Sequence, residues 1–238
     1  MIREGEHRFF GPDDSESTVI RIIGEPRRLG EGFYGVVYEI TAAVKINDGE
    51  EIRSFVVKKY KGDSKDLAQK LAQRALQNHR MVKEAGLKTW ETYLIGHDKD
   101  EQEYILMTSG HDEFTACVSY NPQHLAEEYR PEPFANFPGK KFRELAKTTR
   151  AQALKAAKCD IAFERPDVFF FLMNKQTQTV DVVIGDLDRV AKADPSRRER
   201  TRRDNLSAAR TALTIFVNVY LTPPETYRPI VDHELPER

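Results

Sequence analysis

Three glycines are spaced so that the backbone around them can fold closely over phosphate groups. Gly30, Gly32 and Gly35 fall at the spacing G-x-G-x-x-G in LGEGFYGVVYEI, and Val37 follows two residues after the last glycine. Glycine reaches positive φ at little steric cost, and without a Cβ its backbone N–H groups can approach phosphate oxygens. The spacing therefore predicts a phosphate-covering turn, although a glycine-rich β-turn without a ligand has the same spacing.

The residues after these glycines favour a second strand over a helix. Residues 36–40 read VVYEI and residues 54–58 read SFVVK, two β-rich runs on either side of a turn around Asn47-Asp48-Gly49. A dinucleotide fingerprint opens a helix after its glycines, whereas the protein-kinase glycine loop returns along a strand. Lys58 at the end of the third strand resembles the V-A-I-K signature. The stretch is therefore similar to the N-lobe of protein kinases, which implies that Lys58 contacts nucleotide phosphates.

A further motif that carries this resemblance is acidic and follows an apolar strand in the C-terminal half. Residues 180–184 read VDVVI, and Asp186-Leu187-Asp188 comes after Gly185, where kinases place Asp-Phe-Gly. The resemblance implies that Asp186 binds Mg²⁺, because a hard cation prefers carboxylate oxygens. Leu187 replaces the phenylalanine, and Asp188, in place of the glycine, offers a second carboxylate for the metal. Alone, such a motif also fits a plain turn.

The kinase catalytic loop has no clear counterpart. No His-Arg-Asp occurs, but Arg165-Pro166-Asp167 resembles the Lys-Pro-Glu-Asn that precedes the corresponding strand. That strand is predicted here over residues 168–172, in a hairpin with residues 180–184. This alignment puts Phe163 at the catalytic aspartate position and Val168 at the asparagine position. We expect Asp160 to act as a displaced catalytic base and Asp167 to supply a metal oxygen; a solvated turn explains Asp160 equally well.

The pairing partner of Lys58 is expected on a helix over residues 66–85. Leucines, alanines and Met81 recur there at three- and four-residue intervals, Asp63 or Ser64 can cap its start, and Gly86 follows its end. In a kinase-like lobe this is helix C. The usual interval from Lys58 leads to Gln77, which cannot neutralise a lysine, and Glu84 is either a substitute or a solvated charge.

A hairpin over residues 90–96 and 103–108 is predicted to lead into the hinge. By resemblance, residues 108–112 would bond an adenine edge. Met107 or Thr108 would stand at the back of the adenine pocket, although core packing accounts for both equally well.

The remaining elements divide the chain. We expect a flexible lead-in over residues 1–18, an N-lobe over 19–110, and a linker with a reduced C-lobe over 111–238. Prolines mark residues 113–138 as irregular. Helices are predicted over 140–158 and about 204–221, with Pro223-Pro224 ending the second.

Composition bounds the remaining possibilities. The chain has 238 residues, 39% hydrophobic and 32% charged, with a net charge of −1. It shows no signal peptide and no apolar stretch that could span a bilayer, so we expect a cytoplasmic protein with reduced cysteines and no membrane partner. The net charge argues neither for nor against any partner, and a nucleic-acid partner is not expected.

The resemblance implies an α+β, protein-kinase-like bilobal fold, with an antiparallel N-lobe sheet, helix C and a mainly helical C-lobe. It further implies transfer of the γ-phosphoryl group of ATP, with Mg²⁺, to an unidentified protein or small-molecule hydroxyl. The alternative is a pseudokinase that binds nucleotide or a partner without catalysis. An arginine run over residues 189–203 leaves a nucleic-acid-binding module as a third hypothesis, with a solvated surface as its plain explanation.

Overall fold

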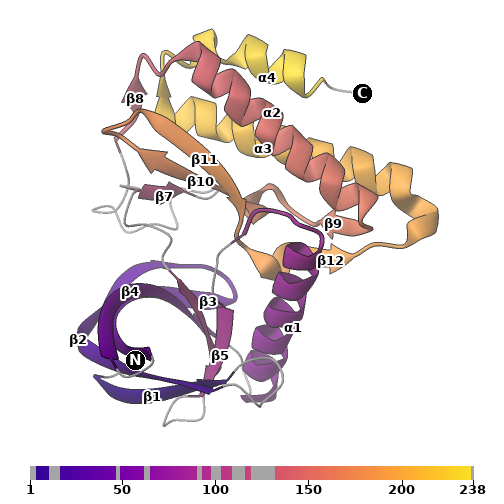
Figure 1. Cartoon of the computed structure of the whole chain (residues 1–238). Coiled ribbons are helices and arrows are strands. Elements are labelled where there is room, and N and C mark those ends of the chain that lie inside the picture. Colours follow the sequence, from indigo (N-terminus) through magenta and orange to yellow (C-terminus); the bar gives the residue numbers. More distant parts are fainter. Residues whose placement is uncertain are drawn as a thin grey trace. The chain divides into compact units, whose positions relative to one another are not determined.

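The computed structural model describes residues 4–10, 17–46, 49–61, 65–89, 93–97, 103–108, 116–118 and 132–236. These residues form two compact units (Figure 1). Unit 1 takes the described residues up to His79 together with 93–97 and 103–108, and unit 2 takes Arg80–Thr89, 116–118 and 132–236. Unit 1 consists mainly of strands, and unit 2 consists mainly of helices with short strands. The α+β, two-lobed architecture expected from the sequence is therefore confirmed.

Unit 1 is built on a closed antiparallel sheet (Figure 1). Its strands are β1 (Gly5–Phe10), β2 (Ser17–Glu31), β3 (Gly35–Ile46), β4 (Gly49–Tyr60), β5 (Tyr93–His97) and β6 (Glu103–Thr108). They pair in the order β1-β2-β3-β4-β6-β5, and β1 then pairs with β5. The expected hairpins β2–β3, β3–β4 and β5–β6 are all present.

Alternating apolar residues make the core of this sheet. Strands place every second side chain on the same face, and one face of β2, β3 and β4 forms a buried cluster. Its members are Ile20, Ile22, Ile40, Ala42, Phe55 and Val57. The other face of β4 is left half-buried, which matters for Lys58 below.

The lead-in expected over residues 1–18 is partly a strand. Residues Gly5–Phe10 pair along their whole length with β2, and Phe9 and Phe10 also pair with β5. β2 begins at Ser17, close to the expected start near Thr18. The expectation failed because the partners of β1 lie in other strands, which local composition does not reveal.

Helix α1 (Lys65–Glu84) confirms the helix predicted over 66–85. Its buried positions Ala68, Ala72, Ala75 and Val82 follow helical spacing. Gly86 adopts φ +65°, and the N–H of Leu87 bonds the carbonyl of Val82, which is the expected glycine-terminated helix end. The candidate caps Asp63 and Ser64 lie outside the described residues.

Unit 2 combines helices with short sheets. Its helices are α2 (Gly139–Lys158), α3 (Arg198–Tyr220) and α4 (Arg228–Glu234). Its strands are β7 (Ala116–Val118), β8 (Phe134–Ala135), β9 (Ile161–Phe163), β10 (Phe169–Asn174), β11 (Thr179–Ile184), β12 (Val190–Lys192) and β13 (Leu221–Thr222). Single 3₁₀ turns occupy Pro166–Val168, Leu187–Arg189, Pro195–Arg197 and Pro224–Thr226.

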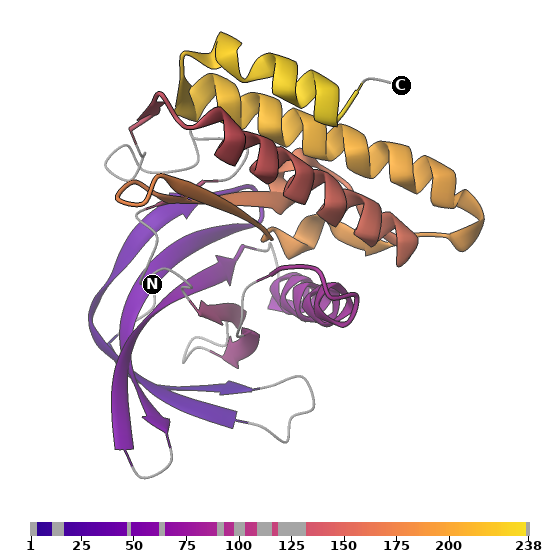
Figure 2. The same cartoon turned by 45° about the horizontal axis from the view of Figure 1, so that its top comes forward.

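Helices α2 and α3 lie side by side and pack on the β10–β11 hairpin, and α4 packs against α2 and α3 (Figure 2). Phe142 of α2 meets Tyr227 edge to face at 5.2 Å, and Phe171 of β10 lies 4.6 Å from Phe216 of α3, centroid to centroid. The buried Tyr227 hydroxyl donates to the carbonyl of Phe137 at 2.7 Å. This aromatic core fixes the hairpin that carries the acidic residues.

Two predicted boundaries moved. The helix predicted from about residue 204 begins at Arg198, because the arginines of its first turns pair with acids one turn away, Arg202 with Glu199 and Arg200 with Asp204. Val168, expected to start a strand, closes a 3₁₀ turn instead. Otherwise the described elements follow the order implied by the kinase resemblance.

Candidate functional site

The glycine turn is a tight connection between β2 and β3. Gly30 pairs with Val37, and the N–H of Gly32 donates to the carbonyl of Gly35 at 2.8 Å. Phe33 at the tip is 86% exposed and touches Tyr34 edge to face at 5.0 Å. Glu31 accepts ion pairs from both Arg28 and Lys61, which ties the base of the turn to β4.

The glycines serve this turn by their small size. The expectation of positive φ is wrong here, because Gly30, Gly32 and Gly35 are not among the positive-φ residues. A Cβ on Gly35 would lie 2.6 Å from the carbonyl oxygen of Lys59, whereas one on Gly32 would meet nothing within 4 Å. Gly35 is therefore required by the close approach of β4, and Gly32 leaves open backbone at the tip.

Lys58 and Val37 lie directly opposite each other on β4 and β3. Opposed residues share a face of the sheet, and this is the face away from the core, since Val57 and Phe55 alternate with Lys58 into it. The Lys58 ammonium nitrogen lies 5.2 Å from the centroid of the Tyr60 ring. The structure thus brings together two of the residues expected to contact a nucleotide.

Met107 and Thr108 lie on β6, next to β4. Their backbones pair with Val56 and Phe55, so both stand near the strand that carries Lys58. The rest of the expected hinge, residues 109–112, lies outside the described residues.

Helix α1 does not present the expected partner of Lys58 on its buried face. Gln77 and Glu84 are both exposed. The buried polar residues are instead Asn78 and His79, at 8% and 6% exposure. His79 follows Ala75 by four residues and precedes Val82 by three. This helical spacing in the sequence could have predicted that His79 lies on the buried face of α1.

In unit 2, two acidic residues come together at one end of the β10–β11 hairpin. The turn Pro166–Val168 precedes β10, and Asp186 follows β11. The N–H of Gly185 donates to the carbonyl of Val168 at 2.8 Å, which ties the two turns together. A Cβ on Gly185 would lie 2.3 Å from the Phe170 ring, so only glycine fits at this junction.

One oxygen of the Asp167 carboxylate is shielded from solvent. Its Oδ1 is buried and accepts no hydrogen bond within the part of the chain that the structure describes. Burial raises the pKa of Asp167, and the negative charge of Asp186 raises it further. The positive charges of Arg189 and Arg165 oppose this rise without outweighing it, so the charged form of Asp167 is costly.

These two carboxylates fit a magnesium ion. Mg²⁺ in phosphoryl-transfer sites is bound through one or two carboxylates, with phosphate and water oxygens completing the octahedron. Among the described residues no group of three or more His, Cys, Asp or Glu is arranged to hold a metal. Asp188 is buried, at 6% exposure, in the turn Leu187–Arg189.

Asp160 is not part of this acidic group. It precedes β9, whereas Asp167 follows β9, and the antiparallel pairing of β9 with β12 puts Ile161 opposite Lys192 and Phe163 opposite Val190. Asp160 therefore lies at the Lys192 end, away from Asp186. Its two carboxylate oxygens accept from Nε and Nη2 of Arg198 at 2.9 and 3.0 Å, and this bond holds its pKa below the usual range.

Glu164 is the acidic residue that stands at the other end of β9. Its N–H donates to the carbonyl of Arg189 at 2.8 Å, and the N–H of Arg189 donates to the carbonyl of Asp186 at 3.0 Å. Two backbone bonds thus link Glu164 to the Asp186 turn. The sequence analysis did not single out Glu164, although it is the residue directly after the apolar residues of β9.

Asn205 holds this strand in place. It is fully buried on α3; its Oδ1 accepts from the N–H of Phe163 at 2.8 Å, and its Nδ2 donates to the carbonyls of Ile161 and Ala153 at 2.8 and 3.3 Å. Asn205 lies four residues before the buried Ala209, on the same apolar stripe of α3. This spacing could have predicted from the sequence that Asn205 is buried.

The arginine run is largely paired within unit 2. Besides the helix pairs, Arg197 pairs with Asp194 and Arg198 with Asp160. This pattern favours the solvated-surface explanation of the run. Within the described part of the chain, every helix falls short of the length or the apolar character that a bilayer crossing requires.

Comparisons with known proteins give structural likenesses only. A scan against models of protein families finds no match, and a search of curated proteins finds none either. Among solved structures, the chain is similar to a double mutant of the PknI kinase domain of Mycobacterium tuberculosis, at 14% identity and TM-score 0.45 over 91% of this chain and 86% of that one. A second, single-mutant structure of the same domain gives 14% identity and TM-score 0.46 over 88% and 81%.

Proposed function

We propose that this chain binds Mg-ATP and transfers its γ-phosphoryl group to a hydroxyl of a protein or small molecule. Unit 1 contributes the glycine turn and Lys58, with Val37, Met107 and Thr108 beside them. Unit 2 contributes Asp186 and Asp167. The observation that carries the proposal is the buried, unsatisfied Oδ1 of Asp167 beside Asp186, because this pair is matched to a cation.

Each contribution has a simple physical role. Gly32 carries no side chain that would keep phosphate oxygens away from the turn, and Lys58 neutralises their charge. Mg²⁺, held by Asp167 and Asp186 when bound, supplies charge neutralisation at the phosphates. Such transfer depends mainly on positioning and on charge, so a departure in the catalytic loop lowers the rate without abolishing the reaction.

Glu164 replaces Asp160 in this proposal as the group that orients the acceptor hydroxyl. Glu164 is exposed and is linked by backbone bonds to the Asp186 turn. Asp160 is occupied by Arg198 at the opposite end of β9. A carboxylate held in a two-bond ion pair is a poor proton acceptor, since its pKa is lowered.

One observation favours a second function, a pseudokinase that binds nucleotide or a partner without catalysis. The positions aligned with the catalytic aspartate and asparagine are Phe163 and Val168, and both side chains are buried, at 4% and 0% exposure. Neither can reach an acceptor or a metal.

The test measures binding and turnover on the same samples. Binding of a fluorescent ATP analogue is titrated with and without Mg²⁺, and phosphate transfer or release is then followed. The variants are Lys58→Ala, Asp186→Ala and Glu164→Gln, with Asp160→Asn as the matched carboxylate control.

We expect Lys58→Ala to weaken binding about tenfold or more, the scale of one charge-assisted contact. Asp186→Ala should remove the dependence on Mg²⁺, and Glu164→Gln should lower turnover while binding persists. Binding without turnover in the wild type would leave the pseudokinase. Absence of nucleotide binding in every sample would refute the phosphotransferase and the nucleotide-binding form of the pseudokinase.

A further inference from the structure

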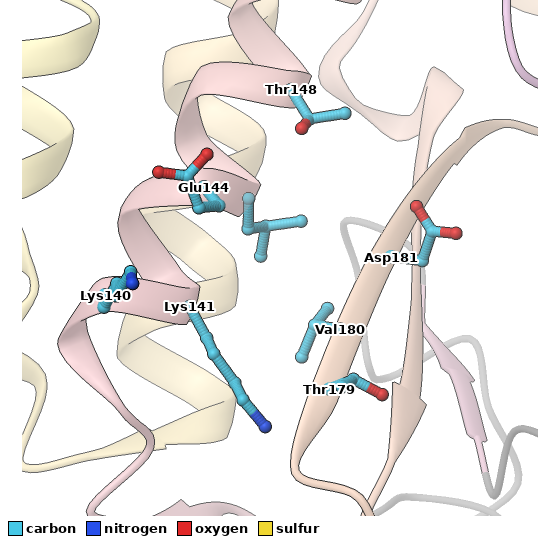
Figure 3. Close-up of a pocket in the computed structure, with 8 residues that line it drawn as sticks. Lys140, Lys141, Glu144, Thr148, Thr179, Val180 and Asp181 are labelled. Atoms are coloured by element: carbon cyan, nitrogen blue, oxygen red, sulfur yellow. The ribbon is translucent and has the colours of Figure 1, made fainter.

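A groove within unit 2 runs between α2 and β11, and its residues do not belong to the acidic pair described above (Figure 3). It has a volume of about 420 Å³, in the range of ligand-binding pockets. Its lining residues are Lys140, Lys141, Glu144, Leu145, Thr148, Thr179, Val180 and Asp181.

The floor of the groove is apolar. Leu145 of α2 lines it and is 4% exposed. Val180 lines it from β11 as a half-buried side chain (Figure 3). Thr148 and Thr179 flank this floor. An apolar side chain placed over Leu145 and Val180 would be removed from water.

The two acidic residues of the groove pair with lysines outside its lining, which leaves the positive charges of its own two lysines. Asp181 already pairs with Lys88, and Glu144 lies 3.5 Å from Lys147. Lys141 reaches from α2 to the β10–β11 turn, where it donates to the carbonyls of Thr177 and Gln178 at 2.8 and 2.9 Å (Figure 3). These acceptors are neutral, so Lys141 keeps its positive charge.

Lys140 adds a second positive charge at the same end. It is exposed, and no ion pair to it occurs among the residues that the structure describes. The first turn of α2 contains no acidic residue, and Pro138 before it provides no side-chain cap. The positive end of the helix dipole therefore adds to the two lysines.

The groove has the shape of an extended peptide. From Lys140 to Thr148 it follows α2 for about 12 Å at 1.5 Å per residue, which matches about four extended residues. β11 is the outer strand of the sheet β11-β10-β7. Its edge is bridged at Ile184 by Thr89, and the N–H of Val182 donates to Oδ1 of Asp181 at 2.8 Å. An extended segment can therefore lie along the other end of β11, at Thr179 and Val180.

We propose that this groove docks a peptide segment of a protein partner, in which an aspartate or glutamate adjoins an apolar residue. The carboxylate pairs with Lys140 and Lys141, and the apolar side chain covers Leu145 and Val180. This docking goes beyond the proposed nucleotide binding and does not depend on it.

The test uses the full chain and three labelled peptides, Asp-Leu-Asp-Leu, Lys-Leu-Lys-Leu and Asp-Gly-Asp-Gly, in a fluorescence-polarisation titration at low salt. The variant is Lys140→Glu. Its matched control is Lys158→Glu, an exposed lysine at the other end of the same helix. A short single-stranded DNA oligonucleotide serves as a polyanion without apolar side chains.

We expect the wild type and Lys158→Glu to prefer Asp-Leu-Asp-Leu over both other peptides and over DNA. Lys140→Glu should weaken this binding by about tenfold, since it exchanges an attraction for a repulsion. ATP-analogue binding should be the same in all three proteins, which separates this test from that of the nucleotide site. Equal binding of DNA, equal losses in both variants, or no peptide preference would each overturn the proposal.

Discussion

Replacing Asp167 by asparagine should stabilise the chain and weaken its affinity for Mg-ATP. The change keeps the shape of the side chain and removes a charge that is desolvated and faces Asp186. Relief of a buried, unsatisfied charged oxygen is worth about 1–2 kcal/mol. In a chain of this size that corresponds to a rise in Tm of about 2–8 °C.

The gain should depend on pH in a defined direction. The folded-state pKa of Asp167 is raised above its unfolded value, so the folded chain holds this proton longer. Its stability is therefore greatest below the unfolded pKa of about 3.9 and falls as the pH rises through the folded pKa. The Tm difference between Asp167→Asn and wild type should be small near pH 4 and increase toward neutral pH.

Thermal unfolding across this pH range, without metal, measures the effect. Asp160→Asn is the control of opposite sign, because the Arg198 bond lowers the pKa of Asp160 and its contribution to stability is lost as the pH falls. Saturating Mg-ATP, at about a hundred times its Kd, should add about 2.7 kcal/mol to the wild type and much less to Asp167→Asn. A lower Tm for Asp167→Asn at neutral pH, or equal stabilisation by Mg-ATP, would refute this reasoning.

Three further changes test the framework of the site. Asn205→Ala strands buried backbone groups of β9 and should cost about 2–4 kcal/mol in the free energy of unfolding, whereas the exposed Asn218→Ala should cost under about 1 kcal/mol; urea denaturation compares them. Gly185→Ala places a Cβ 2.3 Å from the nearest carbon of the Phe170 ring and should cost about 1–3 kcal/mol, with partial rescue by Phe170→Leu in the double variant, again by urea denaturation. Deletion of residues 1–10 exposes edges of β2 and β5 and should produce oligomers in size-exclusion chromatography; a monomer as stable as the full chain would contradict the importance of β1.

Periodic patterns allowed much of the fold to be predicted from the sequence. Helices α1 and α2 and the β10–β11 hairpin appear close to their expected positions, because alternation and helical spacing are local properties. β1 was missed because it is defined by partners far along the chain. The start of α3 was missed because its first turns are a charged run that resembled a loop. Ion pairs one turn apart stabilise the helix through this run.

The candidate site was predictable only where the order of elements fixes it. Asp167 comes just before the first strand of one hairpin and Asp186 just after its second strand, so the sequence could place them together. Asp160 was misplaced because the register of β9 against β12, which decides at which end of β9 a residue lies, leaves no trace in composition. Gln77 was chosen by counting from Lys58, whereas the rotation of α1 buries His79 instead.

The closure of the unit 1 sheet by β1 has a consequence for synthesis. β1 leaves the ribosome first, but its second partner, β5, follows only after β2, β3, β4 and α1. Pairing between strands so far apart along the chain is slow, since the loop must close before the contact stabilises it. During translation the first strand therefore has one free edge until β5 emerges, and this edge is where a nascent chain would be most open to pairing with another copy.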